Sequence, residues 1–376
     1  MHVTRVSSTE QLRDLAGGWN CLTRGVPFRS WEWLATWWEH YGGLRRELYV
    51  LPVYDRGGAL VGVAPWYAEN IRSRGRVLRF LGSGAVCSDY LSVLSTHEHE
   101  EAVTAALAEW LVAAAGRNAR HDTYDTWDLL ELDGVTTTDS AIARLVGNLN
   151  EAGCTVHRRA GLNCWQIELP ATWQQYVSQF STSRRRKIRR LQTVAREKGV
   201  SLHVAQSDDE RDQALRILVR LHQARRRSLG EPGCFAEEAF SSFFSGVVDS
   251  LGSDGSLQLA WIELDGQPIG ADVLLASDTT DYLYQSGIDP RNLAFQPGHL
   301  STLLLIERAI EQSRSVLDFL RGDEPYKASW GARPVPTQSI RVAANRMAPQ
   351  IRHGVWLAGL TMKNWVKSGL SLAGVH

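Results

Sequence analysis

The chain has 376 residues, of which 44% are hydrophobic, and its 41 Lys and Arg residues balance its 41 Asp and Glu residues. This length and composition predict two globular domains, and the balanced charge excludes an overall field that would select nucleic acid. Five scattered cysteines without a CxxC pair speak against a disulfide framework and a zinc site. No stretch approaches the roughly 20 apolar residues of a membrane span, and the N-terminus has no apolar signal segment, so we expect a cytoplasmic protein.

The first half predicts an aromatic helix, two strand pairs, a long helix and a further strand. Trp31, Leu34, Trp38 and Tyr41 recur at the spacing of one helix face, which is typical of a core stripe. The "HEHE" at 97–100 is a polar helix start rather than a metal site, because no third ligand is placed. The expected elements are a helix at 31–41, strands at 47–54, 59–68, 77–82 and 89–94, a helix at 100–116 and a strand at 126–134.

The second half repeats this order. Strands at 256–264 and 268–276 flank a "DGQ" turn, and a strand at 281–288, a helix at 298–313 and a strand at 315–320 follow. A repeat of this length indicates domain duplication, so we predict an α/β fold with mixed α+β sheets in two similar domains. The predicted boundaries are 1–165 and 166–345, followed by a C-terminal tail at 346–376.

Two helical regions lie between the copies, at 182–199 and 210–230. Thr182 or Ser183 can cap the first of them. Its "RRRKIRR" segment at 184–190 holds six cations in seven residues. This pattern indicates either a solvated basic helix or a surface for phosphate groups, whether of a cofactor, of tRNA or of an anionic lipid.

Several motifs, taken in order, resemble a known family. "STSRRRKIRRL", "ELDGQPIGADVLL", "AFQPGHLSTLLLIERAI" and "DFLRGDEPYKASW" resemble the acetyltransferase domain of CelD-like proteins in the GNAT superfamily. "FRSWEWLATWWEHYG" and "LVGVAPWYA" resemble the N-terminal part of the same family. The tandem arrangement is also similar to Fem-type aminoacyl transferases, which use aminoacyl-tRNA and carry a Lys after an aromatic residue, as Tyr326 and Lys327 stand here. The resemblance implies a tandem GNAT-like fold with acetyl-CoA as the acyl donor.

The start of the helix near residue 298 is the candidate donor site. The first N–H groups of a helix lack partners and carry partial positive charge, which favours an anion. The resemblance implies that this loop cradles the pyrophosphate of CoA, and the predicted residues are Gln296, Pro297, Gly298, His299, Leu300 and Ser301. The alternative is an ordinary helix start with Pro297 in its first turn.

The segment "RGDEPYK", which follows the apolar run "SVLDFL", is the candidate catalytic segment. Transfer of an acyl group from a thioester to an amine requires a base, oxyanion donors and an acid for the leaving thiolate. Asp323 or Glu324 is the candidate base, Tyr326 the candidate acid, and Lys327 the candidate for stabilising negative charge. The alternative is a surface loop in which Asp323 pairs with Lys327 or Arg321, bent at Pro325.

Four further residues are candidates for contact with the acceptor. Asp272 interrupts an apolar strand, which costs free energy unless the carboxylate is paired or faces water. Asp89 and Tyr90 stand at the comparable place in the first half, and Tyr284 lies on the next strand of the second half. We expect these residues to shape an acceptor cleft between the two halves.

The sequence thus predicts an acyl-CoA-dependent acyltransferase, an N-acetyltransferase in the favoured form, acting on an amine or hydroxyl acceptor without a metal. The resemblance implies polysaccharide or cell-envelope biosynthesis, a small-molecule or glycan- or lipid-linked acceptor, and contact with polysaccharide-synthesis machinery or the membrane surface. One alternative is a Fem-like transferase that uses aminoacyl-tRNA, the only nucleic acid expected. The other is a non-catalytic scaffold with the same fold, in which the C-terminal tail binds a partner.

Overall fold

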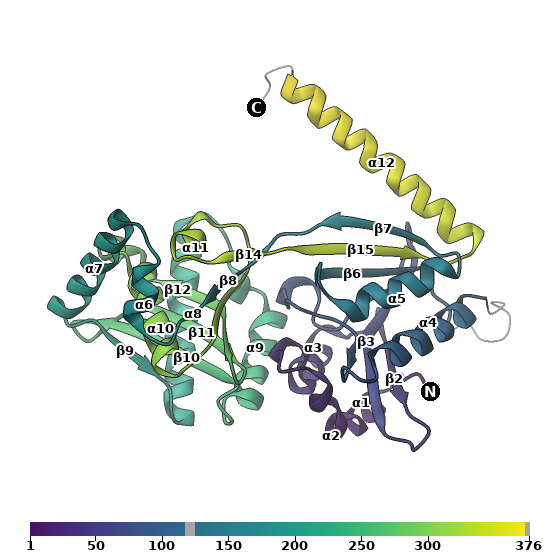
Figure 1. Cartoon of the computed structure of the whole chain (residues 1–376), viewed down its shortest axis with the longest axis horizontal. Helices are drawn as coiled ribbons and strands as arrows, with labels where there is room; N and C mark the ends of the chain where they lie inside the picture. The colour runs from purple at the N-terminus through teal and green to yellow at the C-terminus, as the bar shows by residue number, and fades with distance from the viewer. Residues whose placement is uncertain (117–124, 373–376) are drawn as a thin grey trace.

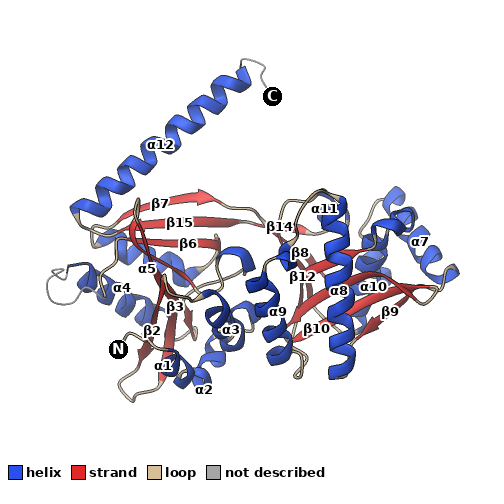
Figure 2. Ribbon diagram, turned by 180° about the vertical axis from the view of Figure 1, so that it is seen from behind, coloured by secondary structure: helices blue, strands red, loops and turns tan. Residues whose placement is uncertain are grey.

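The computed structural model describes residues 1–116 and 125–372, which form two mixed sheets with helices packed on them (Figures 1 and 2). The first sheet holds eight strands, β1 (His2–Val3), β2 (Arg46–Tyr54), β3 (Leu60–Ile71), β4 (Gly75–Phe80), β5 (Leu94–Ser95), β6 (Leu129–Thr136), β7 (Thr155–Ala160) and β15 (Thr337–Ala343). Their order is β1-β2-β3-β4-β6-β15-β7, with β5 beside β3. The pair β4–β6 is parallel, and the other paired neighbours in this sheet are antiparallel.

The second sheet has seven strands and repeats this plan. They are β8 (Cys164–Glu168), β9 (Ser201–Val204), β10 (Leu257–Leu264), β11 (Gln267–Ala276), β12 (Thr280–Ile288), β13 (Val316–Arg321) and β14 (Arg333–Val335). Their order is β14-β8-β13-β12-β11-β10-β9, and β12–β13 is the parallel pair. The predicted α/β fold with two similar mixed sheets is therefore confirmed.

Helices cover both sheets. They are α1 (Thr9–Asp14), α2 (Ala16–Trp19), α3 (Trp31–Tyr41), α4 (Glu100–Gly116), α5 (Ser140–Glu151), α6 (Trp173–Ser178), α7 (Thr182–Glu197), α8 (Asp208–Ser228), α9 (Glu238–Leu251), α10 (Pro297–Glu311), α11 (Pro325–Ser329) and α12 (Met347–Leu372). Short 3₁₀ turns are η1 (Asn20–Leu22), η2 (Pro27–Arg29), η3 (Gly84–Val86), η4 (Cys234–Ala236) and η5 (Pro290–Phe295). In the second half, α8 packs with the odd-numbered residues of β10, and α10 packs with the even-numbered ones. Successive strand residues face opposite sides, so these two helices cover opposite faces.

A two-stranded ribbon joins the two sheets. Strand β7 lies in the first sheet and continues after a few residues as β8 in the second. The strands β14 and β15 run back along it, with Val335 opposite Cys164 in one sheet and Gln338 opposite Ala160 in the other. The sequence-based boundaries assign residues 337–343 to the second half, whereas the structure pairs them with β6 and β7 of the first. Strand pairing over such a distance leaves no local signal in the sequence.

The aromatic helix α3 forms the core between the halves. Its buried face carries Trp33 and Trp37. Of the predicted stripe, Leu34 is buried as expected, whereas Trp31, Trp38 and Tyr41 are only partly buried. The Trp33 ring lies 5.2 Å from that of Tyr284 on β12, at close to a right angle. Edge-to-face aromatic contacts of this kind stabilise a core beyond the area that they bury. The two halves therefore share one hydrophobic core.

Two local predictions were wrong in detail. The expected strand at 89–94 is reduced to Leu94–Ser95, because Tyr90 has a φ of 61° that breaks an extended chain. The cap of α7 is Ser181, whose side chain accepts the N–H of Arg184, one residue earlier than predicted. The "DG" turn is as expected, since Asp265 and Gly266 both have positive φ, as a tight hairpin turn requires.

The C-terminal helix α12 leaves the first sheet after β15 and stands away from both halves (Figure 1). Among the described residues, no helix combines the length and the apolar character that crossing a membrane would need.

Candidate functional site

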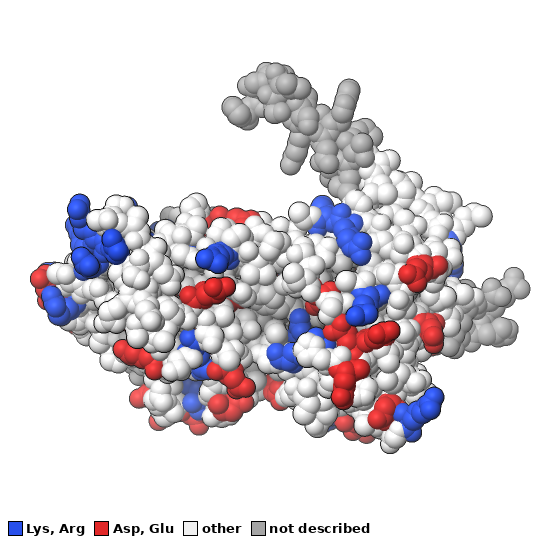
Figure 3. All heavy atoms as spheres, in the orientation of Figure 1, with Lys and Arg blue, Asp and Glu red and all other residues white. Residues whose placement is uncertain are grey.

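A cavity of about 380 Å³ lies between α7 and the start of α10. Four cations line it, Arg184, Lys187, Arg190 and Lys198. Its remaining walls come from Leu191, Val194, Ala294, Phe295, Gln296 and His299. Figure 3 shows basic side chains gathered at the end of the molecule that α7 occupies in Figure 1. The structure thus brings the basic helix and the predicted phosphate loop to one cavity.

The packing of α7 explains why its cations surround this cavity. Ile188 and Ala195 are the buried residues of the helix, and α7 packs on α10. The residues between them are left to the cavity and to solvent, and most of the "RRRKIRR" cations are exposed. One side of α7 therefore faces solvent, and the other faces the cavity.

The start of α10 offers fewer amides than a standard helix terminus. Gln296 has a φ of 54°, and its carbonyl accepts the N–H groups of both His299 and Leu300. Pro297 has no N–H, which leaves Gly298 as the first-turn amide without a backbone partner among the described residues. An anion here would depend mainly on the four cations of α7.

Arg184 is the cation most deeply placed in the cavity wall. Its guanidinium lies 4.8 Å from the centre of the Trp330 ring, a cation–π contact. Its Nε and Nη2 atoms are buried and have no hydrogen-bond partner within the described chain. Burial lowers the pKa of His299 next to it, and Arg184 adds to this effect, so the imidazole is neutral at pH 7. A guanidinium with unused donors beside a neutral ring suits a phosphate or carboxylate.

Lys327 closes the end of β13. Its side chain is 3% exposed, and Nζ donates to the carbonyls of Leu320, Arg321 and Gly322 at 3.0–3.2 Å. Nζ also lies 2.9 Å from a carboxylate oxygen of Glu324. An ammonium has only three N–H donors, so these contacts use all of them. In this conformation Lys327 fixes the backbone that leads into α11.

The other residues of the predicted catalytic segment are exposed. Asp323 accepts hydrogen bonds from Asn163 Nδ2 and Trp165 Nε1 at 2.9 and 3.0 Å, and these bonds lower the pKa of its carboxyl. The Tyr326 ring packs edge-on against Phe319, and burial of its hydroxyl raises its pKa. The Glu324–Lys327 pair realises the alternative of a loop salt bridge, with a different carboxylate from the one expected.

Asp89 and Tyr90 reach across to the second half. Tyr90 Oη donates to Asp318 Oδ2 at 2.5 Å, and Gln166 Nε2 donates to the same oxygen at 2.9 Å. Asp89 forms an ion pair with Arg321 at 2.5 Å, with its carboxylate 2% exposed. These contacts join the loop after η3 to the end of β13.

Asp318 is the centre of this polar cluster. It is fully buried, and burial raises its pKa to about 6, against the opposing hydrogen bonds from Tyr90 and Gln166. Leu320 N also donates to it, at 2.7 Å, and both Leu320 and Tyr90 have positive φ. Such backbone costs on the order of 1–3 kcal/mol per residue, and it clusters at functional sites.

The parallel strands β12 and β13 diverge at the same point. Their pairing runs from Thr280–Val316 to Tyr282–Asp318 and then stops, although both strands continue. On its other edge, β13 pairs with β8 from Val316 to Arg321. Asp318 therefore lies at the last residue pair that joins the two parallel strands.

Asp272 and Tyr284 lie in separate places. Asp272 is buried on β11, accepts a short hydrogen bond from Ser301 Oγ of α10, and has its pKa raised by burial to about 7. Tyr284 Oη donates to Val86 O of the first half at 2.7 Å. The six predicted donor residues differ in their positions. Gln296 and His299 line the cavity, whereas Leu300 and Ser301 are buried.

Asp318, Gln166 and Arg184 were not singled out from the sequence as site residues. Asp318 interrupts the apolar run "SVLDFL" as Asp272 interrupts "PIGADVLLA". The cost of burying an unpaired acid pointed to both residues equally. Gln166 has no such signal, since its role depends on which strand lies beside β13.

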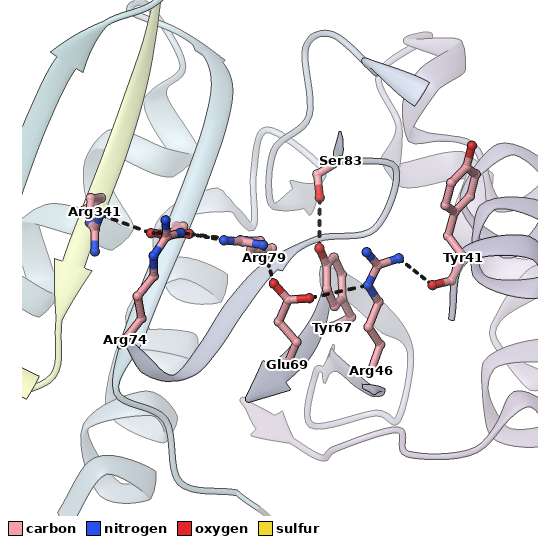
Figure 4. A network of polar contacts seen from close by, with 9 residues as sticks. Tyr41, Arg46, Tyr67, Glu69, Arg74, Arg79, Ser83 and Arg341 are labelled. Atoms are coloured by element: carbon pink, nitrogen blue, oxygen red, sulfur yellow. Dashed lines mark hydrogen bonds and ion pairs between the residues drawn. The ribbon is translucent and has the colours of Figure 1, made fainter. Parts of the chain in front are cut away.

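The first sheet has an ion network at the equivalent register (Figure 4). There the last pair of the parallel strands is Arg79–Glu131. Glu131 also contacts Arg74 and Arg341, and Arg79 reaches Glu69, which contacts Arg46. The network fills this position with paired charges on the face of the first sheet where Val77 and Leu129 form a small separate core.

Comparison with known proteins agrees with this geometry. Residues 181–328 match a family described as "Acetyltransferase (GNAT) domain", a span that runs from the cap of α7 into α11. Over nearly its full length, the chain has the fold of FemX, with a TM-score of 0.62 and 13% identity, covering 93% of this chain and 99% of that one. No curated protein sequence matches.

Two further structures share the fold. A conserved protein of unknown function from Bacteroides thetaiotaomicron has a TM-score of 0.56 at 10% identity, covering 91% of this chain and 100% of that one. The C-terminal domain assigned to a lysylphosphatidylglycerol synthetase from Agrobacterium fabrum has a TM-score of 0.54 at 10% identity, covering 94% of this chain and 97% of that one. The chain is a tandem GNAT-fold protein, and its second half resembles a GNAT acetyltransferase domain.

Proposed function

We propose that the protein is an acyl-CoA-dependent acyltransferase, with acetyl-CoA as the favoured donor and an amine or hydroxyl as the acceptor. The observation that carries this proposal is the cavity between α7 and the start of α10, which four cations line. The phosphates of CoA carry several negative charges, and charge-assisted bonds to Arg and Lys are the strong class of hydrogen bond. No group of three or more potential metal ligands is found among residues 1–116 and 125–372.

The chain's residues fit the phosphates of such a donor. Arg184, with two unused buried donors, would hold one phosphate, and Lys187, Arg190 and Lys198 would neutralise the others. Leu191, Val194 and Phe295 give the cavity an apolar wall. When bound, the thioester supplies an activated acyl group.

We assign the removal of the acceptor's proton to Tyr90 and Asp318. Asp318 is ionised above about pH 6, and Tyr90 donates its proton to it. The Tyr90 oxygen can then accept a proton from the acceptor while its own passes to Asp318. Asp323 and Glu324 remain the exposed alternatives, although the lowered pKa of Asp323 makes it a weaker base. Asp89 and Tyr284 would border the acceptor, and Tyr326 would return a proton to the leaving thiolate.

A Fem-like transferase that uses aminoacyl-tRNA is the second candidate. Arg185, Arg186 and Arg189 extend the basic surface of α7 beyond the cavity wall. Cations outside a small-molecule cavity are suited to a nucleic-acid backbone. A role in polysaccharide or cell-envelope biosynthesis on the cytoplasmic side, with a glycan- or lipid-linked acceptor, is proposed on the CelD-like resemblance alone.

Calorimetric titration with acetyl-CoA and with free CoA tests the donor. We expect micromolar binding that Lys187→Glu with Arg190→Glu weakens at least tenfold. Arg186→Glu with Arg189→Glu makes the same charge change on the same helix outside the cavity wall, and should change binding less than about threefold, by long-range field alone. Absence of binding by the wild-type protein would overturn the acyl-CoA proposal, and retained binding by the double variant would exclude this cavity.

A further inference from the structure

The C-terminal helix α12 exposes an apolar face. Met347, Ile351 and Val355 follow each other at a spacing of four residues and are 79%, 59% and 69% exposed. Residues four apart lie on one side of a helix, so these three side chains form one stripe. At helical spacing Ala358 continues this stripe, and no charged residue interrupts it.

The charges of α12 all have one sign. From 347 to 372 the sequence contains Arg352, Lys363 and Lys367 but no Asp or Glu. At 100° per residue, Arg352 lies about 100° from Ile351 around the helix, outside the apolar stripe. A helix with an uninterrupted apolar face and only positive charge on the remainder is typical of segments that lie in the plane of an anionic membrane surface.

The first turns of α12, called its root below, are fixed to the protein on the side opposite the apolar stripe. His353 is 3% exposed and its ring stacks on Trp356, while the Arg341 guanidinium of β15 lies 3.7 Å from the centre of the Trp356 ring. Arg352 reaches Asp128 at 3.2 Å. The root uses the side away from the stripe, so docking to the first sheet leaves Met347, Ile351 and Val355 in solvent.

We propose that α12 is an interfacial anchor that inserts its apolar face into an anionic lipid surface. The exposed stripe supplies apolar burial, and the excess of Lys and Arg over acids in this segment supplies attraction to acidic headgroups. The fixed root means that the lipid surface lies on the side of the protein where α12 leaves the first sheet (Figure 2). This inference concerns location only and does not depend on the acyl donor.

Vesicle flotation of the full chain tests the proposal. We expect the protein to float with vesicles that contain phosphatidylglycerol and phosphatidylcholine in equal parts, and at least fivefold less with pure phosphatidylcholine. Ile351→Asp with Val355→Asp should reduce flotation at least tenfold, because both charges would enter the apolar layer. Leu44→Asp is the matched control, since Leu44 is a fully exposed apolar residue elsewhere, and it should leave flotation unchanged.

Three other results would overturn the proposal. The first is the absence of flotation by the wild-type protein. The second is equal flotation by the Ile351→Asp, Val355→Asp variant. The third is a dimer in sedimentation analysis that this double variant converts to monomer while flotation is unaffected, because the stripe would then bind a second copy. Unchanged circular dichroism and melting temperature of each variant show that a loss of flotation is not caused by unfolding.

Discussion

The two halves have the same strand plan but opposite chemistry at equivalent helix starts. In the second half, α10 begins beside four cations. In the first half, α4 begins with Glu100 and Glu101, and Glu100 is buried against Arg24 at 2.8 Å. Acidic side chains in the first turn complement the positive end of the dipole of α4. Of the two similar halves, the second has a cation-lined cavity at this helix start.

The parallel strand pairs differ in the same way. In the first sheet the last pair, Arg79–Glu131, is neutralised within a network of ion pairs. In the second sheet the last pair is Tyr282–Asp318, and the acid is held by Tyr90 and Gln166 without a cation in hydrogen-bond contact. Burial of Asp318 without a counter-charge in contact raises the pKa of its carboxyl. The comparison places the titratable chemistry in the second half.

The largest expected effect tests whether β15 belongs to the first half. Val342 is fully buried between β6 and β7, and Val342→Asp should destabilise the protein by more than about 3 kcal/mol. Hydrogen exchange should show faster exchange in β6 and β7, although the substitution lies close to the C-terminus. Faster exchange confined to the second sheet would contradict the assignment of this strand.

The second-largest expected effect concerns Asp272 on β11. The strand at the same place in the first sheet, β3, carries no acid among its buried residues 61–68. Burial raises the pKa of Asp272 to about 7, above its ordinary value, so the folded state binds this proton more tightly than the unfolded state. Its contribution to stability is therefore complete at low pH and is lost as the pH rises toward 7. Urea unfolding should show that the free energy of unfolding of Asp272→Asn, relative to that of the wild type, increases by roughly 2–4 kcal/mol between pH 4 and pH 8. A pH-independent difference would show that Asp272 does not titrate in this range.

Glu100→Gln tests the claim that α4 is closed by its own acids. The substitution weakens the contacts with Arg24 and Arg144, and should lower stability by about 1–2 kcal/mol. Binding of acetyl-CoA, measured by calorimetry, should stay within twofold of the wild type. A new binding site in the variant, or a loss of donor affinity, would mean that the two helix starts are not independent.

The smallest expected effect on stability concerns the bond between the halves, although loss of the Tyr90 hydroxyl should also lower the turnover rate by at least about tenfold. Tyr90→Phe removes the hydrogen bond to Asp318 and should cost about 1 kcal/mol of stability. That bond lowers the pKa of Asp318, so its loss should move the acidic limb of an activity–pH profile upward. An unchanged limb together with full activity would remove Tyr90 and Asp318 from the proton transfer.

The sequence allowed the fold to be predicted in outline, because each strand and helix carries its own periodicity. Helices such as α4, α8 and α10 and the "DG" hairpin were predicted within a few residues. The pairing of β15 with β6 could not be predicted, since it joins residues far apart in the chain. The site was predicted as a set of segments rather than as contacts. The basic segment and Gln296 do meet, but no local pattern indicated that three carbonyls would hold the ammonium of Lys327.

The ribbon of β7–β8 and β14–β15 has a consequence for synthesis on the ribosome. The first sheet lacks its strand between β6 and β7 until residue 343 has been translated, long after the rest of that half. At about 5–20 residues per second, the edges of β6 and β7 stay unpaired for roughly ten to forty seconds. Such edges are templates for pairing with other chains. A nascent chain of this protein is therefore exposed to misassembly until its last strand arrives, and the first half, expressed by itself, would keep that vulnerability permanently.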